Sequence, residues 1–185
     1  NYVNLEIPNI NSSSNDVKTV VNGSVMVFPI KDKTFNGTTI TSKYQEPRPN
    51  ERSKVHYGID FAIPVNTPLV SVWDGVVTRT EHKDLSDTDD KYDVKSYGIR
   101  LEIKHNNGLI SLYGHLSSIP DNISVGVQVN AGDLVAYSGS TGYVTDMNGN
   151  PLSSSAKKAG QGAHLHFALK KNPSDAVTSF TDPTP

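Results

Sequence analysis

The stretch from Gly98 to His115, GIRLEIKHNNGLISLYGH, has the pattern that most clearly predicts the fold. Ile99, Leu101 and Ile103 alternate with charged residues, which is the period of a strand with one apolar and one polar face. The Asn-Asn-Gly sequence at 106–108 then favours a tight turn, and a second apolar run follows it. We therefore expect an antiparallel hairpin with one face exposed to water.

Short apolar runs recur on both sides of this hairpin at intervals of roughly ten residues, separated by Gly, Pro, Asn and Asp. This spacing is typical of an all-β domain. Two longer polar segments, 83–96 and 143–161, lack the apolar spacing of a helix, so we expect them to be loops at a functional rim. The expected strands are residues 24–28, 59–63, 69–72, 75–81, 98–105, 109–115, 134–138 and 164–169.

The length of 185 residues fits one folded domain, which we place at residues 24–172. Residues 1–23 are polar and rich in Asn and Ser, and we interpret them as a linker or an edge segment. Residues 173–185 are rich in Pro and are expected to form a tail. Because both ends have the composition of linkers, we expect further domains of a larger protein beside this one.

The composition excludes several classes of protein and of site. The net charge is -2 with the two signs nearly balanced, which argues against a nucleic-acid-binding surface. The chain has no Cys, so disulfides, a thiolate metal site and a cysteine nucleophile are excluded. No apolar run approaches the roughly 18 residues that a membrane-spanning helix needs. Any metal must therefore be bound by His and carboxylate side chains.

Two pairs of residues have the spacing of metal ligands. His164 and His166 lie two apart in an apolar run, so on a strand they share a face. His56 and Asp60 lie four apart and also share a face. Zinc binds imidazole nitrogen and carboxylate oxygen, and a catalytic zinc site leaves one position for water. Spacing alone thus indicates a β-rich domain with a candidate His and Asp metal site.

Each histidine also has an ordinary structural explanation. His115, at the end of an apolar strand, could be a hydrogen-bonded structural residue. His105 begins the turn of the hairpin, where a capping role is the simpler one. His82 lies in a polar stretch and is expected to be solvated.

Several short motifs occur along the chain in a fixed order. They are HYGIDFAIP at 56–64, WDGVV at 73–77, HNNG at 105–108, LYGHLS at 112–117, AGD at 131–133, SGSTG at 138–142 and GAHLHF at 162–167. Together they resemble the lysostaphin-type metallopeptidases, a family also called M23 peptidases or LytM domains. The resemblance covers roughly residues 27–169.

The resemblance implies a mostly antiparallel sheet with a narrow groove and one zinc ion per chain at its floor. In the family pattern, the His and Asp of the first motif and the second His of the last motif bind zinc. Here these residues are His56, Asp60 and His166. His164 and His115 match the two histidines that the family assigns to catalysis. His164 is then the expected general base for zinc-activated water, and His115 the expected stabiliser of the tetrahedral intermediate.

The implied activity is that of a zinc-dependent endopeptidase that hydrolyses peptide bonds of bacterial peptidoglycan. Family substrates are cut in the cross-bridge at Gly-Gly bonds, or in the stem peptide at bonds around D-Ala and diaminopimelate or Gly, and the sequence leaves this choice open. The resemblance also implies a place outside the cell or in the cell wall, as a secreted or virion-associated protein.

Two other functions fit the same fold. The chain could be a catalytically silent scaffold or activator of other cell-wall enzymes, although all five polar positions of the family are retained. It could instead be a wall-binding β module with a structural zinc, which would need a closed site of four ligands where only three match.

The chain departs from the family pattern at Tyr44 to Arg48, YQEPR, where many members have Phe-Gly-x-Arg. We expect this difference to affect the wall of the groove and not the metal. The segments 83–96 and 143–161 are also longer than in many members, and we expect both to influence the choice of substrate.

Overall fold

A computed structural model describes residues 18–21, 24–48, 54–82 and 97–184. The prediction of a mostly antiparallel β fold with few helices is confirmed, because strands dominate these ranges and the helices in them are short. None of the helices in the described ranges is long and apolar enough to cross a membrane. The segment 83–96, expected to be a loop, lies outside the described residues, as do residues 1–17 and 22–23 of the expected linker.

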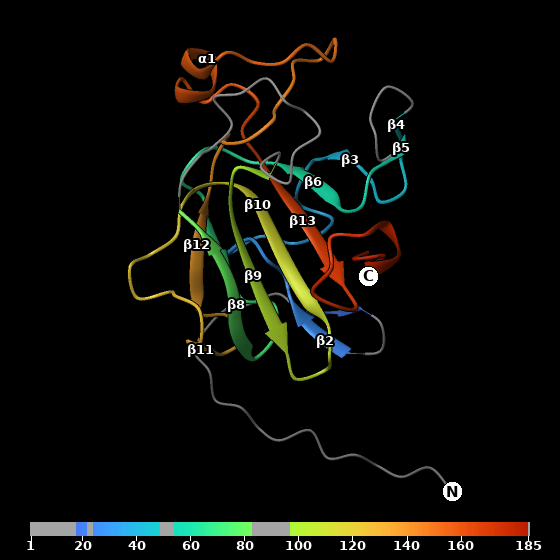
Figure 1. Cartoon of the computed structure of the whole chain (residues 1–185), viewed down its shortest axis with the longest axis vertical. Helices are drawn as coiled ribbons and strands as arrows, with labels where there is room; N and C mark the ends of the chain where they lie inside the picture. The colour runs from blue at the N-terminus through green and yellow to red at the C-terminus, as the bar shows by residue number, and fades with distance from the viewer. Residues whose placement is uncertain (1–17, 22–23, 49–53, 83–96, 185) are drawn as a thin grey trace, which may run out of the picture.

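The main sheet has the strand order β11-β8-β9-β10-β13-β6-β3 (Figure 1), and in addition β12 pairs with β10 and β7, and β14 pairs with β13. The described strands are β1 (Lys18–Val21), β2 (Ser24–Val27), β3 (Ile40–Ser42), β4 (Pro47–Arg48), β5 (Lys54–Val55), β6 (Ile59–Ala62), β7 (Pro68–Val70), β8 (Gly75–Glu81), β9 (Ile99–His105), β10 (Ile110–Ser118), β11 (Gln128–Val129), β12 (Leu134–Ser138), β13 (His164–Lys170) and β14 (Phe180–Thr181). The described helices are α1 (Ser154–Lys158) and the 3-10 helix η2 (Val177–Ser179).

The eight strands expected from the sequence are all present, with ends that shift by three residues or fewer. The strands that the sequence did not indicate have two to four residues, too few for an alternating pattern to show. The segment 143–161 is not entirely a loop, because it contains α1. Ser153 caps this helix by accepting a hydrogen bond from the backbone N–H of Ala156, and five residues are too few to display a helical period.

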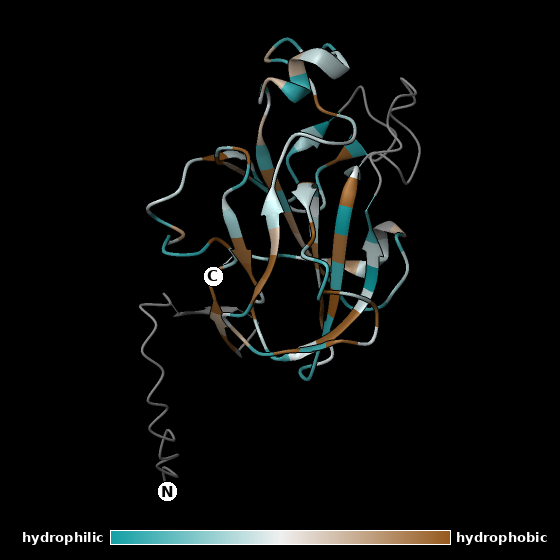
Figure 2. Cartoon of the chain, turned by 90° about the vertical axis from the view of Figure 1, so that its left-hand side faces the viewer, coloured by the Kyte–Doolittle hydropathy of each residue, from teal (hydrophilic) through white to brown (hydrophobic). Residues whose placement is uncertain are grey.

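The core lies on one face of the sheet, where alternate residues of neighbouring strands meet. Leu101 and Ile103 of β9 are fully buried, as are Leu165 and Phe167 of β13, which were expected to face the core. The alternation is visible as bands of contrasting hydropathy along the strands in Figure 2. Every second residue of β13 therefore points to the opposite, outer face, and these residues include both histidines of the strand.

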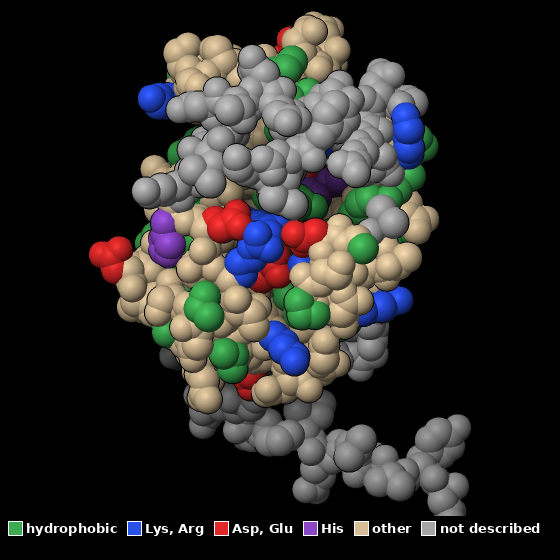
Figure 3. All heavy atoms as spheres, in the orientation of Figure 1, with side chains coloured by type: hydrophobic (Ala, Val, Ile, Leu, Met, Phe, Trp, Pro, Cys, Tyr) green, Lys and Arg blue, Asp and Glu red, His purple; other side chains and the backbone are tan. Residues whose placement is uncertain are grey.

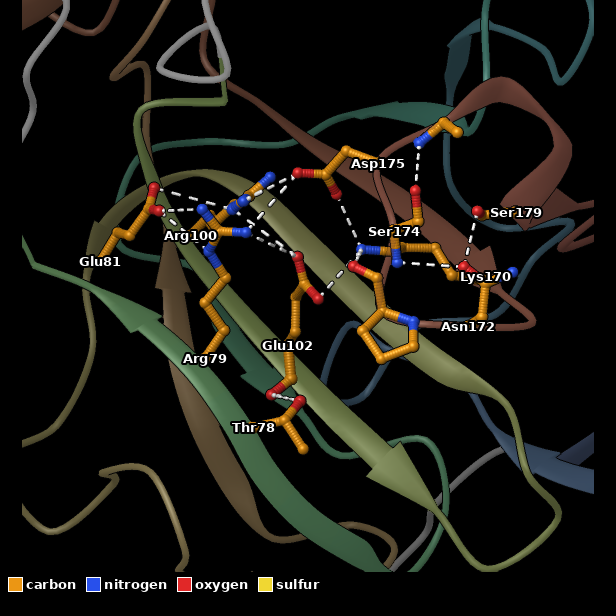
Figure 4. Close-up of polar contacts among 12 residues, drawn as sticks. Thr78, Arg79, Glu81, Arg100, Glu102, Lys170, Asn172, Ser174, Asp175 and Ser179 are labelled. Atoms are coloured by element: carbon orange, nitrogen blue, oxygen red, sulfur yellow. Dashed lines mark hydrogen bonds and ion pairs between the residues drawn. The ribbon is translucent and has the colours of Figure 1, made fainter.

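The outer face of β9 is exposed to water only at Lys104, whereas the whole face was expected to be exposed. Arg100 and Glu102 are buried there in a network of charged side chains (Figure 4). Lys170 of β13 donates to Glu102 at 3.1 Å and to Asp175 at 2.8 Å, and Arg100 donates to Asp175 at 3.2 Å. Burial alone would raise the pKa of Asp175, but its bonds from Lys170 and Arg100 lower it overall. Opposite charges thus pair where solvent was expected.

The segment 173–185, expected to be a tail, lies against the sheet over its described part. Asp175 belongs to the charged network, and β14 pairs with the end of β13. Phe180 is buried and stacks on Tyr57 with ring centroids 5.3 Å apart.

His105 is a buried structural residue and not an exposed turn cap. Its Nδ1 donates to the carbonyl of Asp74 at 3.2 Å, and its Nε2 accepts from the hydroxyl of Ser111 at 2.7 Å. The ring packs edge-on against Trp73 at 5.2 Å. Burial lowers the pKa of His105 to about 4, because a protonated ring would have to leave water.

The low pKa of His105 predicts a loss of stability in acid. Below about pH 6.5 the unfolded chain binds a proton at this residue, whereas the folded chain binds it only near pH 4. The free energy of unfolding should therefore fall by about 2–3 kcal/mol from this residue as the pH drops from about 7 to 4.5. Urea unfolding of the metal-free protein should show a shallower decline for His105→Gln. An equal decline in both proteins would contradict this assignment.

Candidate metal centre

The pairing of β6 with β13 places the first and the last of the sequence motifs, 56–64 and 162–167, side by side. Asp60 is the cross-strand partner of His166, and Ala62 is the partner of His164. On its other side, His166 faces Gly114 of β10. The strands β10, β13 and β6 are neighbours in the sheet (Figure 1), so backbone hydrogen bonds fix the positions of these residues relative to one another.

Three ligand atoms converge at this point. The Nδ1 of His166 lies 2.9 Å from the Oδ1 of Asp60 and 2.9 Å from the Nε2 of His56. The Nε2 of His56 lies 3.1 Å from the same Oδ1. All three residues are buried, and they form the only group of this kind found in the described ranges.

The hydrogen bonds around these atoms fit a divalent cation. The Nδ1 of His56 donates to the carbonyl of Lys43 at 3.1 Å, so its Nε2 carries the lone pair and can bind a metal. The Nε2 of His166 has no hydrogen-bond partner, which leaves its Nδ1 as the atom directed at the other two residues. Atoms at these separations can all lie about 2.0–2.2 Å from one zinc ion.

The protonation states of Asp60 and His166 also suit a metal site. Burial alone would raise the pKa of Asp60, but the adjacent rings of His166 and His56 hold it well below its usual value. Burial lowers the pKa of His166 to about 4. Near neutral pH Asp60 is therefore a carboxylate and His166 a neutral imidazole, which are the protonation states that bind a metal.

His115 and His164 stand beside this group, with ring centroids 4.4 Å apart. The Nδ1 of His164 donates to the carbonyl of Gly162 at 2.7 Å, and the Nδ1 of His115 donates to that of Thr141 at 2.7 Å. Each ring therefore keeps its Nε2 unprotonated in the neutral state. The Nε2 of His164 lies 3.9 Å from the Oδ1 of Asp60, which places it next to the ligand atoms.

A bulge in β10 brings His115 into the site. The register of β10 against β9 shifts between Tyr113 and Leu116, and His115 has a φ of 58°, which is rare for a residue with a side chain. Burial and the neighbouring His164 hold the pKa of His115 well below its usual value. The strained backbone conformation of His115 thus directs its imidazole into the site.

The structure brings together all five residues that the sequence singled out for the site and leaves His82 exposed and His105 in a separate buried position. Histidine side chains are visible on the face that also carries the charged network (Figure 3).

Sequence reasoning did not identify Tyr97, which forms the aromatic side of the site. The ring centroid of Tyr97 lies 5.1 Å from that of His166 and 6.5 Å from that of His115. The guanidinium of Arg100 lies 5.3 Å from the centre of the same ring. Tyr97 thereby separates the histidines from the charged network. It immediately precedes the expected strand, and no alternating pattern marks it.

Arg48 was also missed. It was expected to affect only the wall of the groove, yet it donates to the Oδ2 of Asp60 at 3.0 Å. The one available signal was its place in the departure from the family pattern at 44–48.

The absence of a side chain at Gly58 lets the first motif approach β13. A Cβ there would lie 2.6 Å from the carbonyl oxygen of Phe167 and 2.7 Å from the Cε1 of His166. Neither contact is tolerated, so the backbone or the imidazole would have to move. Glycine at this position therefore sets the place of His166 relative to His56 and Asp60.

We predict that Gly58→Ala weakens metal binding by about tenfold or more, because the new methyl group displaces the ring of His166. Competition with a chromophoric chelator measures the affinity. Gly149→Ala is the control, because its φ of 81° makes it strained while the space around it is open. The control should lose a little thermal stability and keep its metal affinity. Equal affinity in wild type and Gly58→Ala would contradict the role of this contact.

Comparison with known proteins supports this geometry. The model of peptidase family M23 matches residues 54–178, which include all five site residues. The peptidoglycan DD-endopeptidase ShyA of Vibrio cholerae is 31% identical over 119 residues, which are 64% of this chain and 21% of that protein. The chain spans between 21% and 28% of the length of the curated relatives it matches.

Solved structures with the same fold include two bacterial peptidases. The catalytic domain of the antimicrobial peptidase lysostaphin from Staphylococcus simulans is 26% identical, with a TM-score of 0.58 over 80% of this chain and 90% of that chain. A zinc-containing peptidase from Vibrio cholerae is also 26% identical, with a TM-score of 0.53 over 77% of this chain and 35% of that chain.

Proposed function

Because this chain belongs to peptidase family M23, we propose that it is a zinc-dependent endopeptidase that hydrolyses peptide bonds of bacterial peptidoglycan. The observation that carries the proposal is the convergence of His56, Asp60 and His166, with two further imidazoles beside them. A similar protein is named as a peptidoglycan DD-endopeptidase, and this name supports the substrate class. Such an enzyme would meet its substrate in the cell wall, after secretion or as part of a virion.

We assign His56, Asp60 and His166 as the protein ligands of one zinc ion. Two imidazoles and one carboxylate are a ligand set that suits zinc, and a similar solved structure is described as a zinc-containing peptidase. When bound, zinc acidifies water and polarises a carbonyl group. Near neutral pH Asp60 is already a carboxylate and His166 a neutral imidazole, which are the protonation states that bind a metal.

His164 is the proposed general base. Its Nδ1 is committed to the carbonyl of Gly162, so the Nε2 is the atom that accepts a proton from the attacking water. This Nε2 lies beside Asp60, and the side chain is partly exposed, which leaves room for water and substrate. No carboxylate other than Asp60 belongs to the ligand group in the described residues.

His115 is the proposed stabiliser of the tetrahedral intermediate. Because its Nδ1 donates to Thr141, its Nε2 can donate to an oxyanion only after the ring gains a proton. Its pKa is low at rest, so the neutral form prevails before the reaction. Negative charge on the substrate oxygen favours the protonated ring, and stabilisation is thereby concentrated in the transition state.

The alternatives are less well supported. A silent scaffold would not need His115 in a strained, bulged position aimed at the site. A structural zinc would need a fourth protein ligand, and the group found in the described ranges has three members.

Digestion of purified peptidoglycans of several chemotypes tests the activity, with new peptide termini identified by mass spectrometry. New amino and carboxyl termini within the stem peptide or the cross-bridge are expected for at least one chemotype. Release of sugars alone, or no release from any chemotype by the zinc-loaded protein, would refute the proposal.

Two substitutions separate the proposed roles. His115→Ala should lower kcat/KM by about 100- to 10,000-fold and leave the bound zinc in place, because the ring lies outside the ligand group. His166→Ala should lose both cleavage and zinc. Cleavage is measured on the best peptidoglycan and zinc by elemental analysis of the dialysed protein. Cleavage retained by His115→Ala would remove His115 from the mechanism.

A further inference from the structure

The two oxygens of the Asp60 carboxylate have different partners. Oδ1 faces the nitrogen atoms of His56 and His166. Oδ2 accepts a hydrogen bond from the Nη2 of Arg48 at 3.0 Å. The same Nη2 donates to the hydroxyl of Ser42 at 2.9 Å, so both of its hydrogens are used.

The backbone holds Arg48 in a fixed relation to the first ligand. Arg48 of β4 pairs with Lys54 of β5, two residues before His56. The N–H of Gln45 donates to the carbonyl of His56 at 2.7 Å, and the N–H of His56 donates to that of Glu46 at 2.9 Å. The segment that leads into β4 is therefore hydrogen-bonded directly to the backbone of a proposed ligand.

Ser42 gives the guanidinium a second anchor. Ser42 of β3 is the cross-strand partner of Asp60 in β6, and its hydroxyl lies 3.0 Å from the Nδ1 of His56. Arg48 thus bridges the carboxylate and a hydroxyl on the neighbouring strand. Such a bridge restricts rotation of the carboxylate, because turning it would break a charge-assisted hydrogen bond.

A carboxylate can bind a metal ion through one oxygen or through both. If both oxygens bind, they occupy two coordination positions, so an ion that also holds water becomes five-coordinate and has less room for the substrate carbonyl. The guanidinium on Oδ2 opposes this, since the oxygen would have to give up its bond to a permanently charged donor. A cation near a metal ion does not favour metal binding as such, so the benefit of Arg48 lies in orientation and not in affinity.

We propose that Arg48 is a positioning residue that keeps Asp60 bound to the metal through Oδ1 alone. The inference rests on the proposed function, because it presupposes that the site binds a divalent ion. It assigns to the segment 44–48 a role in the chemistry of the site.

Cobalt(II) in place of zinc tests the inference without any peptidoglycan. Four-coordinate cobalt absorbs visible light much more strongly than five- or six-coordinate cobalt. Arg48→Met should lower this absorption several-fold at one cobalt per chain, because the freed Oδ2 can bind the ion. Arg48→Lys keeps a charged donor and should stay closer to wild type. The kcat/KM of the zinc forms should fall by about 10- to 100-fold in Arg48→Met and less in Arg48→Lys.

Arg79→Met is the matched control. Arg79 is similarly exposed, at 34% against 29% for Arg48, and it also forms ion pairs, with Glu81 and other residues of the charged network. Its ion pairs within the described residues are with Glu81, Glu102 and Asp175 and not with Asp60, so the cobalt spectrum of Arg79→Met should match that of wild type. Thermal unfolding and circular dichroism of all variants check the fold, and Arg48→Gln, which is too short to reach Oδ2, replaces Arg48→Met if that variant does not fold.

The outcomes separate the two proposals. A wild-type chain that binds no cobalt would overturn both the metal site and this inference. A wild type that binds cobalt, with an unchanged spectrum in Arg48→Met, would overturn only the role of Arg48. Loss of cobalt binding by a folded Arg48→Met would also overturn it, because Arg48 would then act on affinity and not on the way in which Asp60 binds.

Discussion

The pairing of β6 with β13 is the interaction on which the site depends. It makes cross-strand neighbours of Asp60 and His166, which are 106 residues apart in the sequence. Strand side chains alternate between faces, so a slip of one residue would turn both His164 and His166 into the core. Leu165 and Phe167, fully packed on the other face, oppose such a slip. The apolar core therefore fixes the register that brings the polar atoms together.

The outer face of the sheet carries two groups of buried polar side chains, the charged network and the candidate metal centre. In the charged network, Arg100 and Lys170 meet carboxylates, so charge is largely balanced within the protein. In the candidate metal centre, the candidate ligand atoms of His56, Asp60 and His166 instead lie close enough together for one ion to contact all three. Tyr97 lies between the two groups.

The inserted segment 143–161 is connected to the side of the site that carries His115. Lys157 of α1 donates to the carbonyl of Gly142 at 2.8 Å, next to the carbonyl of Thr141 that orients the imidazole of His115. Val144 is buried at the base of the segment. A rim anchored in this way can differ between relatives while the imidazole keeps its orientation, which is how loops change substrate choice on a constant scaffold.

The sequence by itself determined the strands with a clear alternating pattern, the family, and the five polar residues at the site, because period and motif order are local properties that each segment carries alone. Only the tertiary structure decided that Arg100 and Glu102 are buried, that His105 is a core residue, and that Arg48 reaches Asp60. These outcomes depend on which distant segment covers a given face. Asp175 and Arg48 belong to such distant segments. Both segments are too short or too irregular to show a periodic pattern in the sequence.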